Sequence, residues 1–166
     1  MRLIPFGFIA LVLTLGLAGC GDDKEVGSIS NDWTGNEIKI EALADPKVEG
    51  VTCHMSHFDR SFLDRIGQGN WFENPSNASI ACRQTGPIHI GDIDFDKNGE
   101  EVFSQRQSLV FKKLAVRRIY DSGSNTLIYL VYSRQVTEGS AKMAISTVSL
   151  YNQNVVWDKV PPIKRD

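Results

Sequence analysis

Several features that mark common protein classes are missing from this sequence. After residue 20, no apolar run approaches the roughly 20 residues that a membrane-spanning helix needs. The 18 Lys and Arg do not outnumber the 20 Asp and Glu, so there is no basic surplus for binding nucleic-acid phosphates. Neither a G-x-S-x-G nor an S-x-x-K motif occurs, so no local motif indicates a serine hydrolase. We therefore predict no nucleic-acid partner and no cofactor, and the sequence leans away from an enzyme.

The first twenty residues, MRLIPFGFIALVLTLGLAGC, contain the longest apolar run of the chain. Arg2 precedes apolar residues from about 3 to 17, and small residues follow, which predicts a secretory signal peptide over residues 1–19. Its last four residues, Leu17-Ala18-Gly19-Cys20, are similar to the lipobox of bacterial lipoproteins, where cleavage precedes a lipidated cysteine. The alternative is an ordinary signal peptide followed by an incidental cysteine.

Lipidation of Cys20 would place the remaining chain on the periplasmic side of a bacterial membrane. The next residue is Gly21 and not Asp, so the usual inner-membrane retention signal is absent and the outer membrane is favoured. Residues 20–35 are polar and predict a flexible tether behind the lipidated cysteine. We expect one globular domain over residues 36–157 and a polar tail over residues 158–166.

Cysteine is scarce, with only Cys53 and Cys82 besides Cys20. Two cysteines in an exported chain most simply form a disulfide. It would close a loop of about 30 residues, which stabilises a fold by about 3–4 kcal/mol in the chain-entropy model. A metal pair or a redox pair would be favoured by a C-x-x-C spacing, which this pair lacks.

The apolar pattern after residue 36 is mostly that of strands. Residues 36–44, 48–57, 78–90, 126–134 and 143–151 alternate or run apolar between turn-forming residues. The segment 58–77 lacks this alternation and predicts a short helix over about 58–66 followed by an irregular loop. The fold class predicted is therefore mainly β, an antiparallel sheet or open barrel with one or two short helices, with α+β as the alternative.

The segment DIDFDKNG is similar to the first half of a calcium-binding loop. Asp94, Asp96 and Asn98 occupy ligand positions, and Gly99 occupies the turn position. However, the twelfth position, which should supply a bidentate carboxylate, is Gln105. We therefore predict an Asn-Gly hairpin turn with no metal, and keep weak calcium binding by these three residues as the alternative.

The three histidines do not form a metal-binding motif. His54 and His57 lie three residues apart on a predicted strand, so they point to opposite faces. An enzyme remains the rival interpretation, with a site assembled from distant residues such as His54 or His89 together with Asp64 and Ser140.

Two further patterns suggest a binding or accessory protein. A groove lined by Trp71, Phe72 and Tyr129 would indicate binding, whereas a large exposed apolar patch would indicate a protein-partner adaptor. The cationic run at Lys112, Lys113, Arg117 and Arg118 is typical of a solvated strand face that protects a sheet edge. Its alternative is a patch for anionic lipid.

Several separated motifs together resemble the CreA family, named for catabolite regulation protein A. They are the Asp45-Pro46 turn, the V-T-C and I-A-C cysteines, Q-x-G-P-I at 84–88, S-L-V-F-K at 108–112, and E-G-S-x-K-x-A-I-S at 138–146. The resemblance covers about residues 37–151 and implies a small exported periplasmic protein without an assigned reaction. The lipobox and the DIDFDKNG segment depart from the family pattern.

Overall fold

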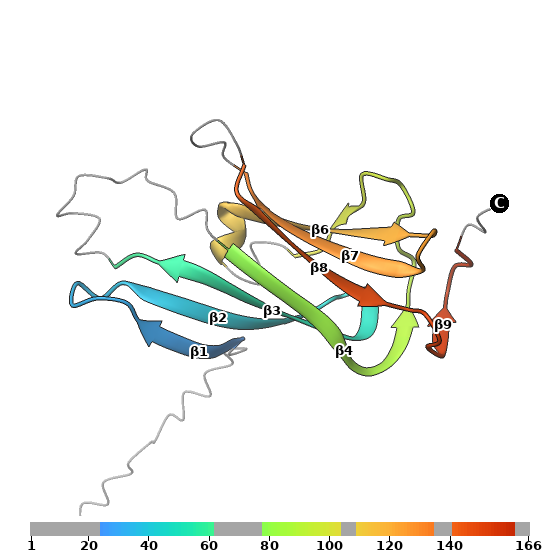
Figure 1. The fold of residues 1–166 in the computed structure, drawn as a ribbon, viewed down its shortest axis with the longest axis horizontal. Coiled ribbons are helices and arrows are strands. Elements are labelled where there is room, and N and C mark those ends of the chain that lie inside the picture. The colour runs from blue at the N-terminus through green and yellow to red at the C-terminus, as the bar shows by residue number, and fades with distance from the viewer. Residues whose placement is uncertain (1–23, 62–77, 104–108, 135–140, 162–166) are drawn as a thin grey trace, which may run out of the picture.

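The computed structural model describes residues 24–61, 78–103, 109–134 and 141–161. These residues form two β-sheets that lie against each other (Figure 1). Sheet A has the strand order β1-β2-β3-β4-β9, and sheet B has the order β5-β6-β7-β8. Within each sheet, strands that follow one another in sequence pair antiparallel, and only β9 pairs parallel, with β4.

Sheet A contains the longest strands of the described chain. Its strands are β1 (Glu25–Ser30), β2 (Glu37–Ala44), β3 (Val48–Asp59), β4 (Ala78–Ile90) and β9 (Val155–Trp157). Sheet B contains β5 (Glu100–Glu101), β6 (Leu114–Asp121), β7 (Thr126–Ser133) and β8 (Met143–Ser149), with a 3-10 helix, η1 (Leu109–Lys112), before β6.

The prediction of a mainly β fold is confirmed, and the two sheets do not close into a barrel. Within the described residues the only helix is η1, so the α+β alternative does not apply. That part of the chain contains no helix long and apolar enough to cross a membrane.

Alternation along the strands determines which side chains enter the core. In β3, Val51, Cys53 and Met55 are buried while their neighbours are not, as the period-2 pattern predicts. The same pattern in β4 buries Ile80 and Cys82. Sheet B supplies the other half of the core through residues that include Phe103, Phe111, Leu114, Val116, Leu127, Tyr129, Val131 and Val148. One apolar core therefore holds the two sheets together.

The predicted disulfide is present between neighbouring strands. Cys53 in β3 lies directly opposite Cys82 in β4, and their Cα atoms are 3.9 Å apart. Both side chains are buried in the core. Pairing of the two cysteines with each other leaves neither as a free thiolate for a metal, so the metal-pair alternative is excluded for them.

Two predicted segments differ from the structure. Phe58 and Asp59, expected to begin a short helix, are the last residues of β3, because the β3 ladder continues to the Asp59–Glu37 pair. The rest of that predicted helix and the following loop lie outside the described residues. Residues 25–30, expected to belong to the tether, form β1, since backbone pairing with β2 orders a segment that has few apolar side chains.

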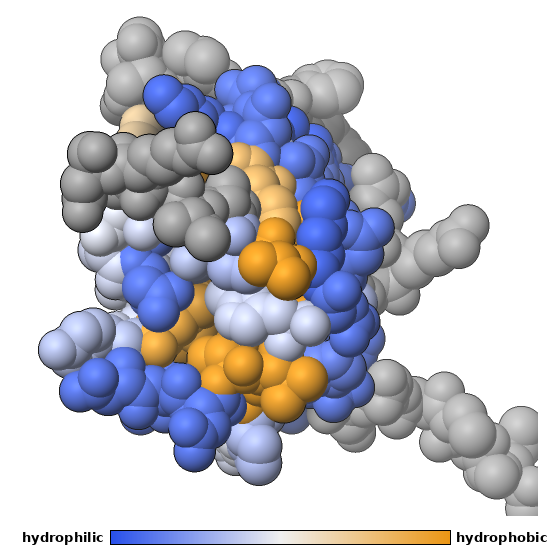
Figure 2. Space-filling model, turned by 90° about the vertical axis from the view of Figure 1, so that its right-hand side faces the viewer, coloured by the Kyte–Doolittle hydropathy of each residue, from blue (hydrophilic) through white to orange (hydrophobic). Residues whose placement is uncertain are grey.

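Strand β9 forms one edge of sheet A and lies at the end of the molecule shown in Figure 2. Hydrophobic residues gather in the middle and lower part of this face between hydrophilic margins (Figure 2). The exposed apolar residues of this part of the chain are Tyr151, Val156 and Val160. Trp157 instead packs against Phe95 and Tyr120. The start of the predicted polar tail is also held, because Asp158 bonds to His89.

Candidate functional site

The two sheets meet where β4 runs beside β8 without forming a ladder with it. The Ser146 hydroxyl oxygen accepts a hydrogen bond from the backbone N–H of Cys82, at 2.7 Å. A side chain of β8 thus satisfies a donor on the edge of β4 that a strand partner would otherwise satisfy. The sheets also meet in two other places, which differ in their chemistry.

At one end, a buried ion pair connects the sheets. Arg118 in β6 is 1% exposed, and Asp45, in the turn between β2 and β3, is 4% exposed. One guanidinium nitrogen of Arg118 donates to both Asp45 carboxylate oxygens, at 2.5 and 2.6 Å. Its other terminal nitrogen donates to Glu100 at 2.7 Å. We call Asp45, Glu100, Arg118 and Tyr129 the closed end.

Tyr129 completes the hydrogen bonding of this buried carboxylate. Its hydroxyl donates to Asp45 Oδ2 at 2.8 Å. Burial, followed by the negative charge of Asp45, raises the pKa of the Tyr129 phenol, so the group stays protonated and remains a donor. The backbone N–H of Lys47 also bonds to Asp45, and the Lys47 ammonium pairs with Glu100. Each buried charge therefore has a partner.

The closed end corrects two predictions. Arg118 was expected on a solvated cationic face, but it lies inside because Leu114, Val116 and Arg118 share the inward face of β6. Only its neighbour Arg117 lies on the outer face. Tyr129 was expected in a binding groove and is fully buried. Trp71 and Phe72, named with it, lie outside the described residues.

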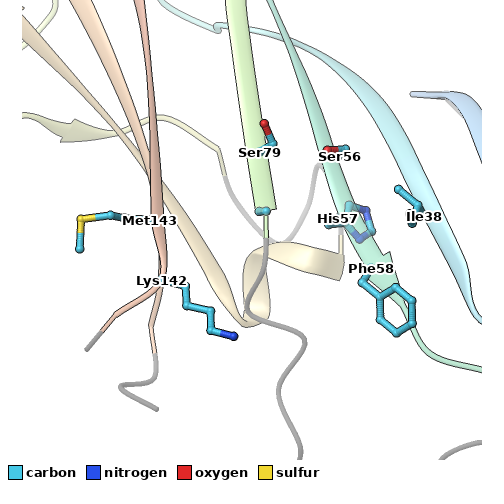
Figure 3. A pocket seen from close by; sticks show the side chains of 8 residues that line it. Ile38, Ser56, His57, Phe58, Ser79, Lys142 and Met143 are labelled. Atoms are coloured by element: carbon cyan, nitrogen blue, oxygen red, sulfur yellow. The ribbon is translucent and has the colours of Figure 1, made fainter. Parts of the chain in front are cut away.

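At the opposite end of the junction, a hollow of about 490 Å³ opens between sheet A and the start of β8. Its lining residues are Ile38, Ser56, His57, Phe58, Ala78, Ser79, Lys142 and Met143. Lys142 points from the start of β8 toward β3, whereas Met143 points to the other side of β8 (Figure 3). We call Ile38, Phe58, Lys142 and Met143 the open end.

A second hollow, of about 590 Å³, lies on the other side of β8 and shares Met143 with the first as a lining residue (Figure 3). Its lining residues are Asn98, Arg117, Leu130, Tyr132, Ala141 and Met143. Its floor is the outer face of sheet B, where directly opposed pairs place Met143 beside Tyr132 and Ile145 beside Leu130. Met143 is 65% exposed and Ile145 is 62% exposed, so this strand leaves large apolar side chains in solvent.

The charged residues that line these two hollows are both cations, Lys142 and Arg117. Among the described residues, no Asp or Glu lines either hollow. Arg117 is held in place because its guanidinium donates to the backbone oxygens of Asn98 and Gly99, and to the Tyr132 hydroxyl at 3.3 Å. An apolar floor with fixed positive charge beside it suits an amphiphilic anion.

The histidines do not form a catalytic group within the described chain. The His57 ring bonds to a carboxylate, with its Nε2 atom 3.1 Å from Glu41 Oε1. His54 lies on the outer face of sheet A, opposite Ala42 and Ala81. His89 lies opposite Glu49 at the other end of β3, five residues and roughly 17 Å from His54 at about 3.3 Å per residue. Asp64 and Ser140, the other residues of the enzyme hypothesis, lie outside the described residues.

His89 has carboxylate partners that are distant in sequence. Its Nε2 lies 2.7 Å from Asp158 Oδ1, and its Nδ1 lies 3.7 Å from Glu49 Oε2. The hydrogen bond to Asp158 and the negative charges of both carboxylates raise the pKa of the His89 imidazole. The arrangement is an exposed ion pair that ties the residue after β9 to β4.

The segment similar to a calcium loop connects the two sheets. The Asp94 and Asp96 carboxylates each accept a backbone N–H two residues on, and the N–H of Gly99 bonds to the Asp96 carbonyl. Gly99 has a φ of +63°, but Asn98 does not have a positive φ, so the turn is not the predicted two-residue hairpin. The physical reason is that β4 and β5 belong to different sheets, so the chain must pass between them. The described residues contain no group of three or more His, Cys, Asp and Glu that could hold a metal.

Comparison with known proteins identifies the family. The family model described as CreA protein matches residues 26–153. Proteins named Protein CreA from Escherichia coli strain K12, strain O6:H1 and O157:H7 are each 42% identical over 147 residues, which covers 83% of this chain and 92% of theirs. The chain belongs to the CreA family. No solved structure matches it.

The segments that suggested the CreA family lie at the sheet junction. The D-P turn supplies Asp45 to the closed end, and the A-I-S segment supplies Ser146 to Cys82. Gly50 has a φ of +76°, and a Cβ there would lie 2.1 Å from the carbonyl oxygen of Pro87 in Q-x-G-P-I. The first two segments therefore contribute contacts between the sheets, and the third contributes a close approach of β3 and β4 within sheet A.

The open end was missed by sequence reasoning, although a signal for it exists. TLIYLVYS in β7 is apolar on both faces, with Leu127, Tyr129 and Val131 buried inside and Ile128 and Leu130 outside. A strand that is apolar on both faces is typical of a sheet that is packed against other structure on both faces. No further described strand covers the outer one.

Proposed function

We propose that this CreA-family protein is a non-catalytic binding protein, held by lipid on Cys20 to the periplasmic side of the envelope, with the outer membrane favoured. Its binding site is the open end, where two hollows on opposite sides of β8 share Met143 as a lining residue. That shared apolar site with cationic side chains is the observation that carries the proposal. The ligand it fits is an anionic amphiphile, such as an acyl chain with a carboxylate or phosphate.

The anchor is supported by the lipobox at residues 17–20 and by the polar residues after it. Its test is detergent-phase partitioning of the full chain expressed in a bacterium. We expect the wild type to enter the detergent phase and Cys20→Ser to stay in the aqueous phase. A wild type without acyl groups on Cys20, judged by mass spectrometry, would refute the anchor.

The binding site is supported by the chemistry of its lining. The apolar side chains Ile38, Phe58 and Met143 provide surface for hydrocarbon, whose burial contributes about 0.8 kcal/mol per CH₂ group. Met143 is also a flexible side chain that adapts to irregular ligands. Lys142 and Arg117 provide charge complementarity for an anionic head group.

The binding test uses a pyrene-labelled fatty acid and its methyl ester as probes. We expect saturable binding of the acid by residues 20–166, and weaker binding of the ester because it lacks the charge that Lys142 and Arg117 attract. Met143→Asp should reduce the affinity at least about tenfold, since it places a negative charge at the shared wall of both hollows.

Thr147→Asp is the matched control. It adds the same charge on the same exposed face of β8, but Thr147 lines neither hollow. The proposal is refuted if the acid does not bind, or if the two aspartate variants weaken binding equally. An unchanged circular dichroism spectrum verifies that both variants are folded.

A further inference from the structure

The β1–β2 hairpin carries large apolar side chains that are exposed to solvent and are not part of the hydrophobic core. Trp33, in the loop between the strands, is 95% exposed. Val26 and Ile29, in the edge strand β1, are each 58% exposed. A single exposed apolar residue is ordinary, but here Ile29 and Trp33 lie four residues apart at the same end of β1.

The loop that carries Trp33 is held by a network of hydrogen bonds. Asp32 accepts from the backbone N–H and the hydroxyl of Thr34, at 2.9 and 2.6 Å, and from the side chain of Asn36 at 2.7 Å. These bonds lower the pKa of the Asp32 carboxyl to about 2, so it stays ionised. The Asn36 side-chain oxygen in turn accepts a hydrogen bond from the backbone N–H of Ser61, two residues after the end of β3. Trp33 is therefore exposed on a loop that hydrogen bonds hold in one conformation.

The hairpin has one apolar and one polar face. Ile29 lies opposite Ile38, and Ile38 lies opposite Phe58, so these three side chains form a row across the outer face of sheet A. On the other face, Lys39 pairs with Glu25 and with Asp59, at 3.6 and 3.1 Å. The apolar row therefore faces away from a layer of ion pairs.

The chain length before β1 limits how far this hairpin can lie from a lipid on Cys20. Three residues lie between Cys20 and Lys24, the first described residue, and the four steps from one Cα atom to the next span at most about 14 Å. β1 begins at the next residue, so its start cannot leave the neighbourhood of the anchor, whatever path the intervening residues take.

We propose that the β1–β2 hairpin lies on the lipid surface that carries the anchor, with Trp33 at the level of the head groups and Ile29 against the bilayer. Trp is the side chain most suited to that level because its ring is apolar and its N–H can bond to head groups. The lipid on Cys20 fixes one end of β1 and Trp33 fixes the other. The inference rests on the proposed anchor.

This orientation turns the open end toward the membrane. Ile38 and Phe58 belong both to the apolar row and to the lining of the first hollow. An amphiphile that leaves the bilayer would therefore enter the hollow without crossing much water.

The test attaches the chain to vesicles chemically, so that it does not depend on lipidation in the cell. Residues 20–166 with the disulfide intact have one free thiol, on Cys20, which couples to a maleimide lipid in phosphatidylcholine vesicles. Brominated phosphatidylcholine quenches tryptophan that reaches the bilayer. We expect quenching of the wild type, and its loss in Trp33→Phe, which keeps the other two tryptophans.

A second pair of variants tests the apolar row. Ile29→Asn should lower the quenching of Trp33 by about half or more, whereas Ser28→Asn, on the opposite face of the same strand, should leave it unchanged. Equal quenching in wild type and Trp33→Phe would overturn the proposal, as would undiminished access of aqueous iodide to Trp33 on vesicles. Dimerisation through the hairpin, detected by light scattering with no quenching, would assign the surface to a second copy instead.

Failure of the anchor and failure of the docking are separable. A chain that is not lipidated in cells but is quenched when coupled refutes the anchor alone. A lipidated chain whose Trp33 stays in water refutes the docking alone.

Discussion

The closed end and the open end of the sheet junction differ in chemistry: one contains paired, buried charges, and the other contains apolar and cationic side chains around hollows. At the closed end, Asp45 and Arg118 are buried and each charge is matched by a partner. At the open end, Met143 remains exposed, one hollow opens between sheet A and β8, and a second lies on the outer face of sheet B; apolar and cationic groups line both. The closed end joins the sheets through buried charges, whereas the open end is where we propose that a ligand binds.

Adjacent arginines on β6 show the difference within one strand. Arg118 points inward to Asp45, and Arg117 points outward to the second hollow. Arg118 has lost its water and depends on its partners, whereas Arg117 keeps part of its hydration.

The largest expected effect comes from breaking the closed end. Arg118→Met should lower the free energy of unfolding by about 3–5 kcal/mol, because Asp45 would remain buried without its counter-charge. Urea unfolding followed by circular dichroism measures the change. Arg117→Met is the matched control and should cost less than about 1 kcal/mol. Equal losses in the two variants would show that the closed end does not hold the sheets.

The disulfide should have the next largest effect. Replacing Cys53 and Cys82 together by alanine should cost about 3–4 kcal/mol, the value for a loop of about 30 residues. Thermal or urea unfolding of the oxidised wild type and the double variant gives the difference. A reductant should destabilise the wild type and leave the double variant unchanged. A double variant as stable as the wild type would contradict this expectation.

Ser146→Ala should produce an intermediate loss. It removes the acceptor for the N–H of Cys82 and should cost about 1–2 kcal/mol in urea unfolding. Thr147→Ala, on the exposed face of the same strand, should change stability by less than about 0.5 kcal/mol. If both cost the same, β4 and β8 are joined by the core alone.

The smallest effect is expected at the exposed His89–Asp158 pair. The pKa of His89 is raised in the folded state, so the pair stabilises the fold below the unfolded pKa of about 6.5 and loses this effect as pH rises through the folded pKa. Melting temperatures of wild type and Asp158→Asn should therefore differ more at acidic than at alkaline pH. A difference independent of pH would mean that the pair acts without charge.

The sequence contained most of the fold but little of the site. Period-2 alternation located the strands because burial on one face leaves that pattern in β3 and β4. The disulfide could be predicted because only two cysteines remained after Cys20. Arg118 was misassigned even though it shares the inward face with Leu114 and Val116, since an arginine is rarely buried without a partner.

The remaining contacts join residues that sequence spacing does not connect. The partner of Arg118 is Asp45, and the partner of His89 is Asp158, each in another element. Such pairs depend on the tertiary arrangement of the strands, which a local sequence pattern does not predict. The first hollow also arises where the sheets meet, because both sheets supply its lining.

The position of β9 has a consequence for the order in which this chain can fold. Strands β1 to β4 and β5 to β8 pair with sequence neighbours, so each sheet can assemble as its residues emerge during synthesis. Ile88 in β4, however, pairs with Val155, close to the end of the chain. Contacts between such distant residues form slowly because a long loop must close first. The edge of β4 at residues 88–90 therefore stays without its partner strand until residues 155–157 have emerged, and a chain that stalls before them would expose that edge to aggregation.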